Sequence, residues 1–292
     1  MKHFFLSALL MAATIAANAQ GQLKLPSLSP TAKISQEFSV SSIEISYSRP
    51  SMRGRKIFGD LLPYGKPWRT GANAPTKIKI GEDLEMGGQK VKAGEYTLYT
   101  IPGKDNWEVI LTNATGGMGG DGYPRESDAA RFNIKPIHLE QECQTFTIQL
   151  SDLTFSTCKL ELVWERTKIV LPIIARNEEH VETSISAAIN HPQPKPYFQA
   201  ANYYFETDKN LELANHYVDT ALMDNPNAYY MWYLKARIER KLGNKDDAIA
   251  AAKKSMEVAK GTPMEGEYTR NNEKLLNEIK MQSGHHHTQE EE

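Results

Sequence analysis

Residues 93–112, AGEYTLYTIPGKDNWEVILT, decide the class of fold. Two runs rich in aromatic and β-branched residues, YTLYTI and WEVILT, lie on either side of a segment that begins with Pro102 and Gly103. Proline and glycine interrupt regular structure, and the flanking residue types are those that favour strands. The stretch therefore predicts two successive strands joined by a short turn.

The same pattern extends outward from this pair in both directions. Between about Thr31 and Pro172, further short runs alternate with a period of two and are separated by Gly, Pro, Asp or Asn: AKISQEF, SIEISYS, TKIKIG, RFNIKPI, TFTIQL, KLELVWE and KIVLPI. Nine short strands without intervening helices predict an antiparallel β-sandwich or a partly open barrel. In SIEISYS, Ile43, Ile45 and Tyr47 should share one face of the sheet.

After Ala175 the period changes to that of a helix. Val181, Ile185, Ala188 and Ile189 predict an amphipathic helix, and the proline-rich residues 191–196 predict a stiff extended linker. Beyond the linker the chain should be helical to about residue 282. We expect an α+β protein in which an all-α array follows the β-sandwich.

The helical region repeats with a period of 34 residues. Phe198 and Trp232 are 34 positions apart, as are Ala214 and Ala248. This spacing of aromatic and small positions resembles the tetratricopeptide repeat, in which small residues let paired helices approach closely. Tyr203, Tyr204, Tyr230 and Tyr233 are candidates to contact a protein or peptide partner, although such aromatics more often form repeat core.

The two ends of the chain and its charge bound its class. A cationic start, an apolar run and the small-x-small site at Ala17–Ala19 predict a signal peptide over residues 1–19. We therefore expect an exported, periplasmic or secreted protein without a membrane span. The formal net charge of −2 argues against a general nucleic-acid binder. The expected regions are residues 26–175 for the sandwich, 176–196 for a helix and linker, 197–283 for the repeats, and 284–292 for a disordered His/Glu tail.

Six blocks of the β region carry a family resemblance. In chain order they are YSRP, GRKIFG, LLPYGKPWRTGAN, AGEYTLYTIP, NWEVILT and LVWERTKIVLPI. Together they resemble the bacterial family named domain of unknown function 2911, over roughly residues 29–174. The resemblance implies the sandwich, export by a Gram-negative bacterium and a helical extension of the kind some members carry. It implies no activity, because the family has none established.

The segment between the second and third strands is the main candidate for a ligand site. Residues 47–73 combine six basic residues with aromatic side chains and turn-forming prolines and glycines. Arginine suits carboxylate and phosphate groups and stacks on aromatic rings. We expect a pocket for a small anionic or saccharide ligand, and its candidate residues are Tyr47, Arg49, Arg55, Tyr64, Trp68, Arg69 and Asn73. The alternative is structural: the arginines tie loop carbonyls together while Phe58 and Trp68 plug one end of the sandwich.

Other motifs are weaker. Residues 117–122 match GxGxxG but lack the following helix that a dinucleotide site requires. Ser156 and Lys159 match SxxK, but in a turn that enters a strand rather than at the start of a helix. Asp121, Glu126 and Asp128 lack the spacing of a calcium loop. The histidines show no metal-ligand spacing, so we expect no cofactor and no metal.

The two cysteines should stay apart. Cys143 lies on the face opposite the apolar residues of its strand, whereas Cys158 shares the apolar face of its own strand. A disulfide would need a bulge or a loop excursion to bring them together.

These observations favour a non-catalytic binding or scaffolding protein of the cell envelope. Two alternatives remain open at this point: a hydrolase or lyase acting on envelope glycans or peptides, with Glu95 as its suspected carboxylate, and a purely structural protein.

Overall fold

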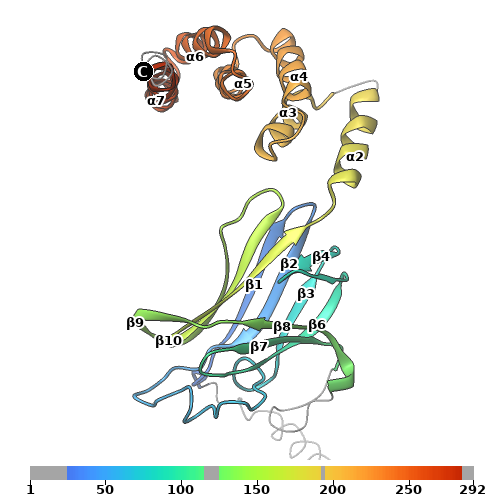
Figure 1. Cartoon of the computed structure of the whole chain (residues 1–292), viewed down its shortest axis with the longest axis vertical. Coiled ribbons are helices and arrows are strands. Elements are labelled where there is room, and N and C mark those ends of the chain that lie inside the picture. Colours follow the sequence, from blue (N-terminus) through green and yellow to red (C-terminus); the bar gives the residue numbers. More distant parts are fainter. Residues whose placement is uncertain (1–24, 115–124, 192–194, 285–292) are drawn as a thin grey trace, which may run out of the picture.

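The computed structural model of the chain describes residues 25–114, 125–191 and 195–284. The predicted signal peptide, the GxGxxG match, the centre of the proline-rich linker and nearly all of the predicted tail lie outside these residues. Within the described ranges, the chain forms two antiparallel sheets followed by six helices (Figure 1).

Among the described residues, the larger sheet has six strands. They are neighbours in the order β1 (Thr31–Phe38), β2 (Ser41–Ser48), β3 (Thr76–Ile80), β6 (Gly94–Ile101), β7 (Trp107–Thr112) and β8 (Asp128–Ile134). The hairpin expected from residues 93–112 is present, with Leu98 opposite Leu111. On β2, Ile43, Ile45 and Tyr47 are buried while Glu44 is exposed, as the alternation predicts.

The smaller sheet has four strands in the described chain, in the order β5 (Gln89–Val91), β4 (Leu84–Met86), β10 (Thr157–Ala175) and β9 (Ile137–Ser151). The hairpin of β4 and β5 was not expected from the sequence. It turns at Gly87, where φ is +52° and a Cβ atom would lie 2.8 Å from a methyl carbon of Leu171. Only glycine combines that backbone conformation with such close packing.

β10 joins two runs that the sequence pattern separates. Its pairing with β9 shifts register on both sides of Glu165, whose φ is +55°. The strand bends there so far that the backbone N–H of Ala175 donates to the carbonyl of Ser156, 2.8 Å away. Conversely, RFNIKPI is split, because β8 ends at Ile134 and β9 begins at Ile137.

The inner faces of the two sheets form one hydrophobic core, so the β region is a sandwich and not a closed barrel. Both cysteines are free, with Cys158 buried in this core and Cys143 half-buried on β9. The side-chain alternation predicted this separation.

The C-terminal region is helical, as the sequence predicts. Its helices are α2 (Glu178–Asn190), α3 (Tyr197–Glu206), α4 (Leu211–Asp224), α5 (Tyr229–Leu242), α6 (Lys245–Ala259) and α7 (Glu265–Gly284). Ala214 and Ala248, which lie 34 positions apart, are both fully buried, and the ring of Phe198 contacts Tyr230 edge to face at 5.1 Å. Figure 1 shows these helices beyond one end of the sandwich, which we call the upper end. No helix among the described residues is long and apolar enough to cross a bilayer.

Candidate functional site

The opposite, lower end of the sandwich is closed by the β2–β3 loop, residues 49–75. Aromatic packing holds this loop in place. Phe58 meets Trp107 edge to face at 4.9 Å, and Trp68 stacks on Trp164 of β10 at 5.7 Å with an interplanar angle of 23°. Phe58 and Trp68 belong to the buried core of the sandwich. The loop is therefore packed as firmly as a strand, although it forms no regular ladder.

Backbone hydrogen bonds add to this packing. Trp68 and Thr100 exchange two of them, at 2.7 and 2.9 Å, and the indole N–H of Trp68 donates to the carbonyl of Gly71. The carboxylate of Glu165 accepts the backbone N–H groups of Ile57 and Phe58 at 3.4 and 3.3 Å. Glu165 thus ties the bend of β10 to the middle of the loop.

Thr70, next to Trp68, is held in a strained conformation. Its φ is +55°, which is rare for a β-branched residue and costs roughly 1–3 kcal/mol. The side chain is fully buried, and its hydroxyl lies 3.1 Å from the hydroxyl of Thr100. Backbone strain of this kind clusters at binding and catalytic sites, so it marks this turn as a candidate site.

A pocket of about 510 Å³ opens beside this turn. Its lining residues come from the loop, from the segment before β1 and from β10: Ser29, Pro50, Arg55, Leu61, Leu62, Pro67, Trp68, Arg69, Gly71, Ala72 and Trp164. The volume lies within the range of small-molecule sites. Three of the residues expected at a ligand site, Arg55, Trp68 and Arg69, line this pocket together.

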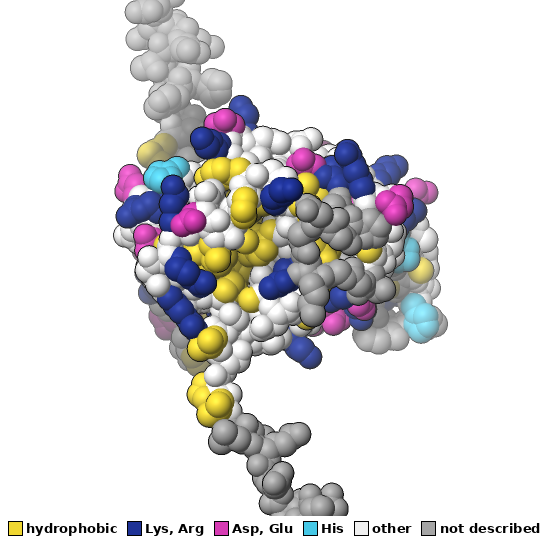
Figure 2. All heavy atoms as spheres, turned by 90° about the horizontal axis from the view of Figure 1, so that it is seen from below, with side chains coloured by type: hydrophobic (Ala, Val, Ile, Leu, Met, Phe, Trp, Pro, Cys, Tyr) yellow, Lys and Arg dark blue, Asp and Glu magenta, His cyan; other side chains and the backbone are white. Residues whose placement is uncertain are grey.

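The guanidinium of Arg55 keeps its positive charge. Its Nε and Nη2 donate to the backbone carbonyls of Met52 and Ser51, both at 2.9 Å. A carbonyl satisfies an N–H donor without cancelling the charge, unlike a carboxylate. Residues 47–73 contain six basic residues and one acidic residue, Asp60. Figure 2 shows this end of the molecule as a patch of hydrophobic side chains bordered by lysine and arginine side chains.

Arg69 also acts on the neighbouring sheet. Burial raises the pKa of the Tyr99 hydroxyl on β6, and the positive charge of Arg69 acts against this rise. Arg69 is half-buried and follows Trp68, whose backbone pairs with Thr100, the β6 residue after Tyr99.

Four of the expected ligand residues do not line the pocket. The Tyr47 side chain is 3% exposed, and its hydroxyl donates to the carbonyl of Ile148 and accepts the N–H of the same residue. Arg49 reaches β9, donating to the carbonyl of Phe146 and the hydroxyl of Thr147. Tyr47 and Arg49 therefore connect the two sheets, as the structural alternative predicts.

The remaining two candidates, Tyr64 and Asn73, belong to the same loop but do not line the pocket. The Asn73 side chain donates to the carbonyl of Ser29 at 3.2 Å, and Tyr64 covers Gly59 while staying 39% exposed. Trp164 was not expected at the site. Its strand parity correctly predicts a buried side chain, but only the bend of β10 brings it under the loop.

The suspected carboxylate lies elsewhere. Glu95 is exposed on β6 opposite Lys79 and does not line the pocket. Among the described residues, no three His, Cys, Asp or Glu side chains gather in a group that could hold a metal ion.

The candidate partner-binding tyrosines differ in exposure. Tyr203, Tyr230 and Tyr233 are half-buried on α3 and α5. Tyr204 is 6% exposed and packs in the core of the helical array beside Tyr217, so it is not available for surface contact.

Comparison with known proteins adds one finding. No curated protein matches the chain. The family described as Protein of unknown function (DUF2911) matches residues 29–173, which span both sheets and the whole of the pocketed loop. Through this region the chain belongs to the DUF2911 family.

Proposed function

We propose that the protein is an exported, non-catalytic binding protein of the cell envelope whose sandwich binds a small ligand carrying a carboxylate or phosphate group. The observation that carries the proposal is the pocket of about 510 Å³ with Arg55 and Arg69 at its wall. Export is supported by the order of cationic start, apolar run and small-x-small site in residues 1–19.

The geometry favours an anion over a neutral sugar. A saccharide usually lies flat on an open aromatic face, but Trp68 and Trp164 are only 7% and 2% exposed. Arg55 has five N–H donors, of which the two carbonyl contacts use two. Its outer donors can therefore form a charge-assisted pair with an anion, which is stronger than a neutral hydrogen bond.

Two substitutions on one loop test the site. We expect Arg55→Gln to weaken binding of glucuronate by about tenfold or more, because a charged hydrogen bond contributes roughly 1.5–3 kcal/mol. The matched control is Arg53→Gln, which removes the same charge from an exposed arginine that donates to Leu28 and does not line the pocket.

Isothermal titration with glucuronate, inorganic phosphate and glucose reads out the result. Binding of glucuronate and phosphate but not glucose supports an anion site. Equal losses in the two variants would attribute the effect to general charge and reject the pocket, and binding of glucose alone would reject the anion.

A second role concerns the helices. We propose that the array, with its resemblance to tetratricopeptide repeats, engages a protein partner. Its support is the half-buried aromatic surface of α5, where the Tyr233 ring centre lies 5.7 Å from the Arg237 guanidinium, itself 4.3 Å from the Phe205 ring centre. Affinity capture with and without residues 197–284 tests this role, and identical partner lists would contradict it.

A further inference from the structure

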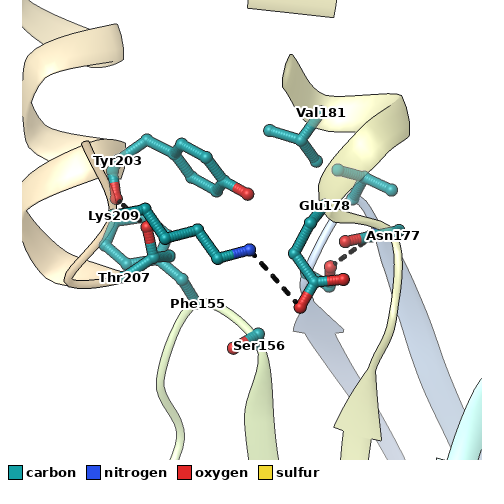
Figure 3. A pocket seen from close by; sticks show the side chains of 10 residues that line it. Phe155, Ser156, Asn177, Glu178, Val181, Tyr203, Thr207 and Lys209 are labelled. Carbon is teal, nitrogen blue, oxygen red and sulfur yellow. Dashed lines mark hydrogen bonds and ion pairs between the residues drawn. The ribbon is translucent and has the colours of Figure 1, made fainter. Parts of the chain in front are cut away.

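A cleft separates the upper end of the sandwich from the first helices. Two adjoining hollows of about 200 and 410 Å³ share Val40, Val181 and Tyr203 as lining residues, and Figure 3 shows the smaller of them. A third hollow of about 560 Å³ continues along the rim of the sandwich and shares Ser39 and Phe155 with the first. Together they form one elongated groove rather than a closed cavity.

The floor of this groove is apolar and open to solvent. Val40 in the β1–β2 turn is 59% exposed, and Leu153 and Phe155 in the β9–β10 turn are 42% and 45% exposed. Large apolar side chains that gather on one exposed surface mark interaction sites in soluble proteins. Val181 and Ile185 of α2 provide the facing apolar wall.

The walls are positioned by polar contacts. The side-chain amide of Asn177, just before α2, donates to the hydroxyl of Ser39 and to the carboxylate of Glu82, at 2.8 and 2.6 Å. Across the groove, the Lys209 ammonium lies 3.6 Å from the Glu178 carboxylate (Figure 3). The α2 wall is thus fixed to the sandwich.

A ring contact completes the groove. Tyr203 of α3 meets Phe155 edge to face at 6.3 Å, so an aromatic side chain stands on each side of the narrowest hollow. This ring contact and the Lys209–Glu178 pair join the two walls of the smallest hollow.

The rim of the groove is predominantly acidic. Glu37, Glu178 and Glu206 line its hollows beside one lysine, Lys209. Lys209 pairs with Glu178, and Arg237 pairs with Glu206 at 3.1 Å, whereas Glu37 is exposed at the rim. Burial raises the pKa of the Tyr203 hydroxyl, and the negative charges of Glu178 and Glu182 raise it further. Such a rim disfavours fatty acids and anionic lipids, and it favours a cationic ligand.

We propose that this groove binds an extended peptide segment of a partner protein in which apolar side chains are flanked by lysine or arginine. The apolar side chains occupy the hollow between Val181, Ile185 and Tyr203. The flanking cations pair with Glu37 and compete with Lys209 and Arg237 for the other rim carboxylates. The proposal refines the partner-binding role of the helices. It is independent of the anion pocket, which lies at the other end of the sandwich.

The test uses fluorescein-labelled hexapeptides with a central pair drawn from Leu, Ile, Phe and Tyr and two lysines on either side. Fluorescence anisotropy with the purified full chain measures their affinity. At least one member should bind about tenfold more tightly than its counterpart with glutamates for lysines or serines for the central pair. Affinity should fall as salt screens the rim charges. Equal binding of the glutamate peptides, or no binding by any lysine peptide, overturns the proposal.

Variants locate the binding. Phe155→Ser and Glu37→Lys, both at exposed positions, should each weaken the peptide by about tenfold, while Met223→Ser, at an 81% exposed site on α4, should not. Unchanged affinity in Phe155→Ser rejects the groove. If laurate binds in the groove more tightly than any peptide, the proposal is also rejected. Loss of peptide binding in Arg55→Gln would place the peptide at the lower end of the sandwich and reject the groove. If Arg55→Gln loses only glucuronate binding, the result bears on the anion site and leaves the groove proposal standing.

Discussion

Replacement of Phe58 tests whether the β2–β3 loop, which carries the pocket, belongs to the core of the sandwich. The Phe58 ring is 4% exposed and contacts Trp68, Trp107 and Trp164, with ring centres 6.5, 4.9 and 6.2 Å away. Truncation of a buried phenylalanine to alanine costs about 3–5 kcal/mol of unfolding free energy. We expect Phe58→Ala to fall in this range, although the residue lies in a loop.

Phe58→Leu separates packing volume from aromatic geometry. Leucine keeps most of the apolar contact but loses the three edge-to-face pairs, each of which contributes about 0.5–1.5 kcal/mol beyond burial. Because these pairs are not additive, we expect a cost of about 1–2 kcal/mol. At a urea m value of about 2 kcal/mol/M, the alanine variant should lower the midpoint by about 1.5–2.5 M and the leucine variant by about 0.5–1 M.

Tryptophan fluorescence is the suitable assay because three of the four tryptophans surround Phe58. The substitution Trp232→Phe removes the fourth, which lies in the helical array, so that the signal comes from the sandwich alone. Phe205→Leu is the matched control, since Phe205 is 4% exposed in the array. It should lower the helical transition seen by circular dichroism and leave the fluorescence midpoint unchanged.

A cost below about 1 kcal/mol for Phe58→Ala would refute the reasoning, because it would mean that the loop is not packed as part of the core. The same variant should lose anion binding even though Phe58 does not line the pocket, since Trp68 and Trp164 would no longer be held in place. Retained binding with a large loss of stability would show that the pocket does not depend on this packing.

Three further predictions concern buried polar groups and the thiols. Burial raises the pKa of the Cys158 thiol to about 12, so iodoacetamide at pH 8 should modify only the half-buried Cys143 in the native protein and both thiols in urea. Burial by itself would raise the pKa of Glu161, but hydrogen bonds from its neighbours outweigh burial and lower the pKa below 4.5. The stabilisation that the Glu161 carboxylate provides is therefore present above pH 4.5 and is lost as the pH falls through the folded-state pKa. Glu161→Gln should lower the urea midpoint at pH 7 and flatten its decline between pH 5 and pH 3, whereas an unchanged profile contradicts this assignment. Tyr47→Phe should cost roughly 1–3 kcal/mol in urea unfolding, because both backbone groups of Ile148 lose their partner, and a neutral result would mean that water replaces the hydroxyl.

The alternation of side chains predicted most of the sandwich because one face of nearly every strand is buried. It could not predict β4 and β5, since three residues are too few to show a period. It also divided β10 at the residues around Glu165. In the structure the pairing with β9 continues through the bend. The left-handed backbone conformation of Glu165, which forms the bend, has no recognisable pattern in the sequence.

The candidate site was predictable in composition but not in geometry. Arginine, tryptophan and turn residues between two strands indicated this loop, and three of the seven candidate residues line its pocket. The sequence could not separate Arg55 from Arg49, because both are basic residues of one irregular loop. Only the tertiary structure shows that one lines the pocket while the other crosses to β9. Trp164 enters the site through long-range packing, which a local pattern does not contain.

The hydrogen bonds of the arginines are compatible with a loop that is both locked in place and able to bind. Arg49 and Arg55 each donate to backbone carbonyls, and these contacts fix the loop as the structural alternative requires. A carbonyl leaves the charge of the guanidinium uncancelled, so the same contacts hold the Arg55 cation at the mouth of the pocket instead of removing it. Arg55 has therefore already lost, on folding, rotamer entropy that an arginine without such contacts would lose on binding an anion. A site built in this way should bind its anion with little rearrangement, and the loop's rigidity is a condition of its binding rather than an alternative to it.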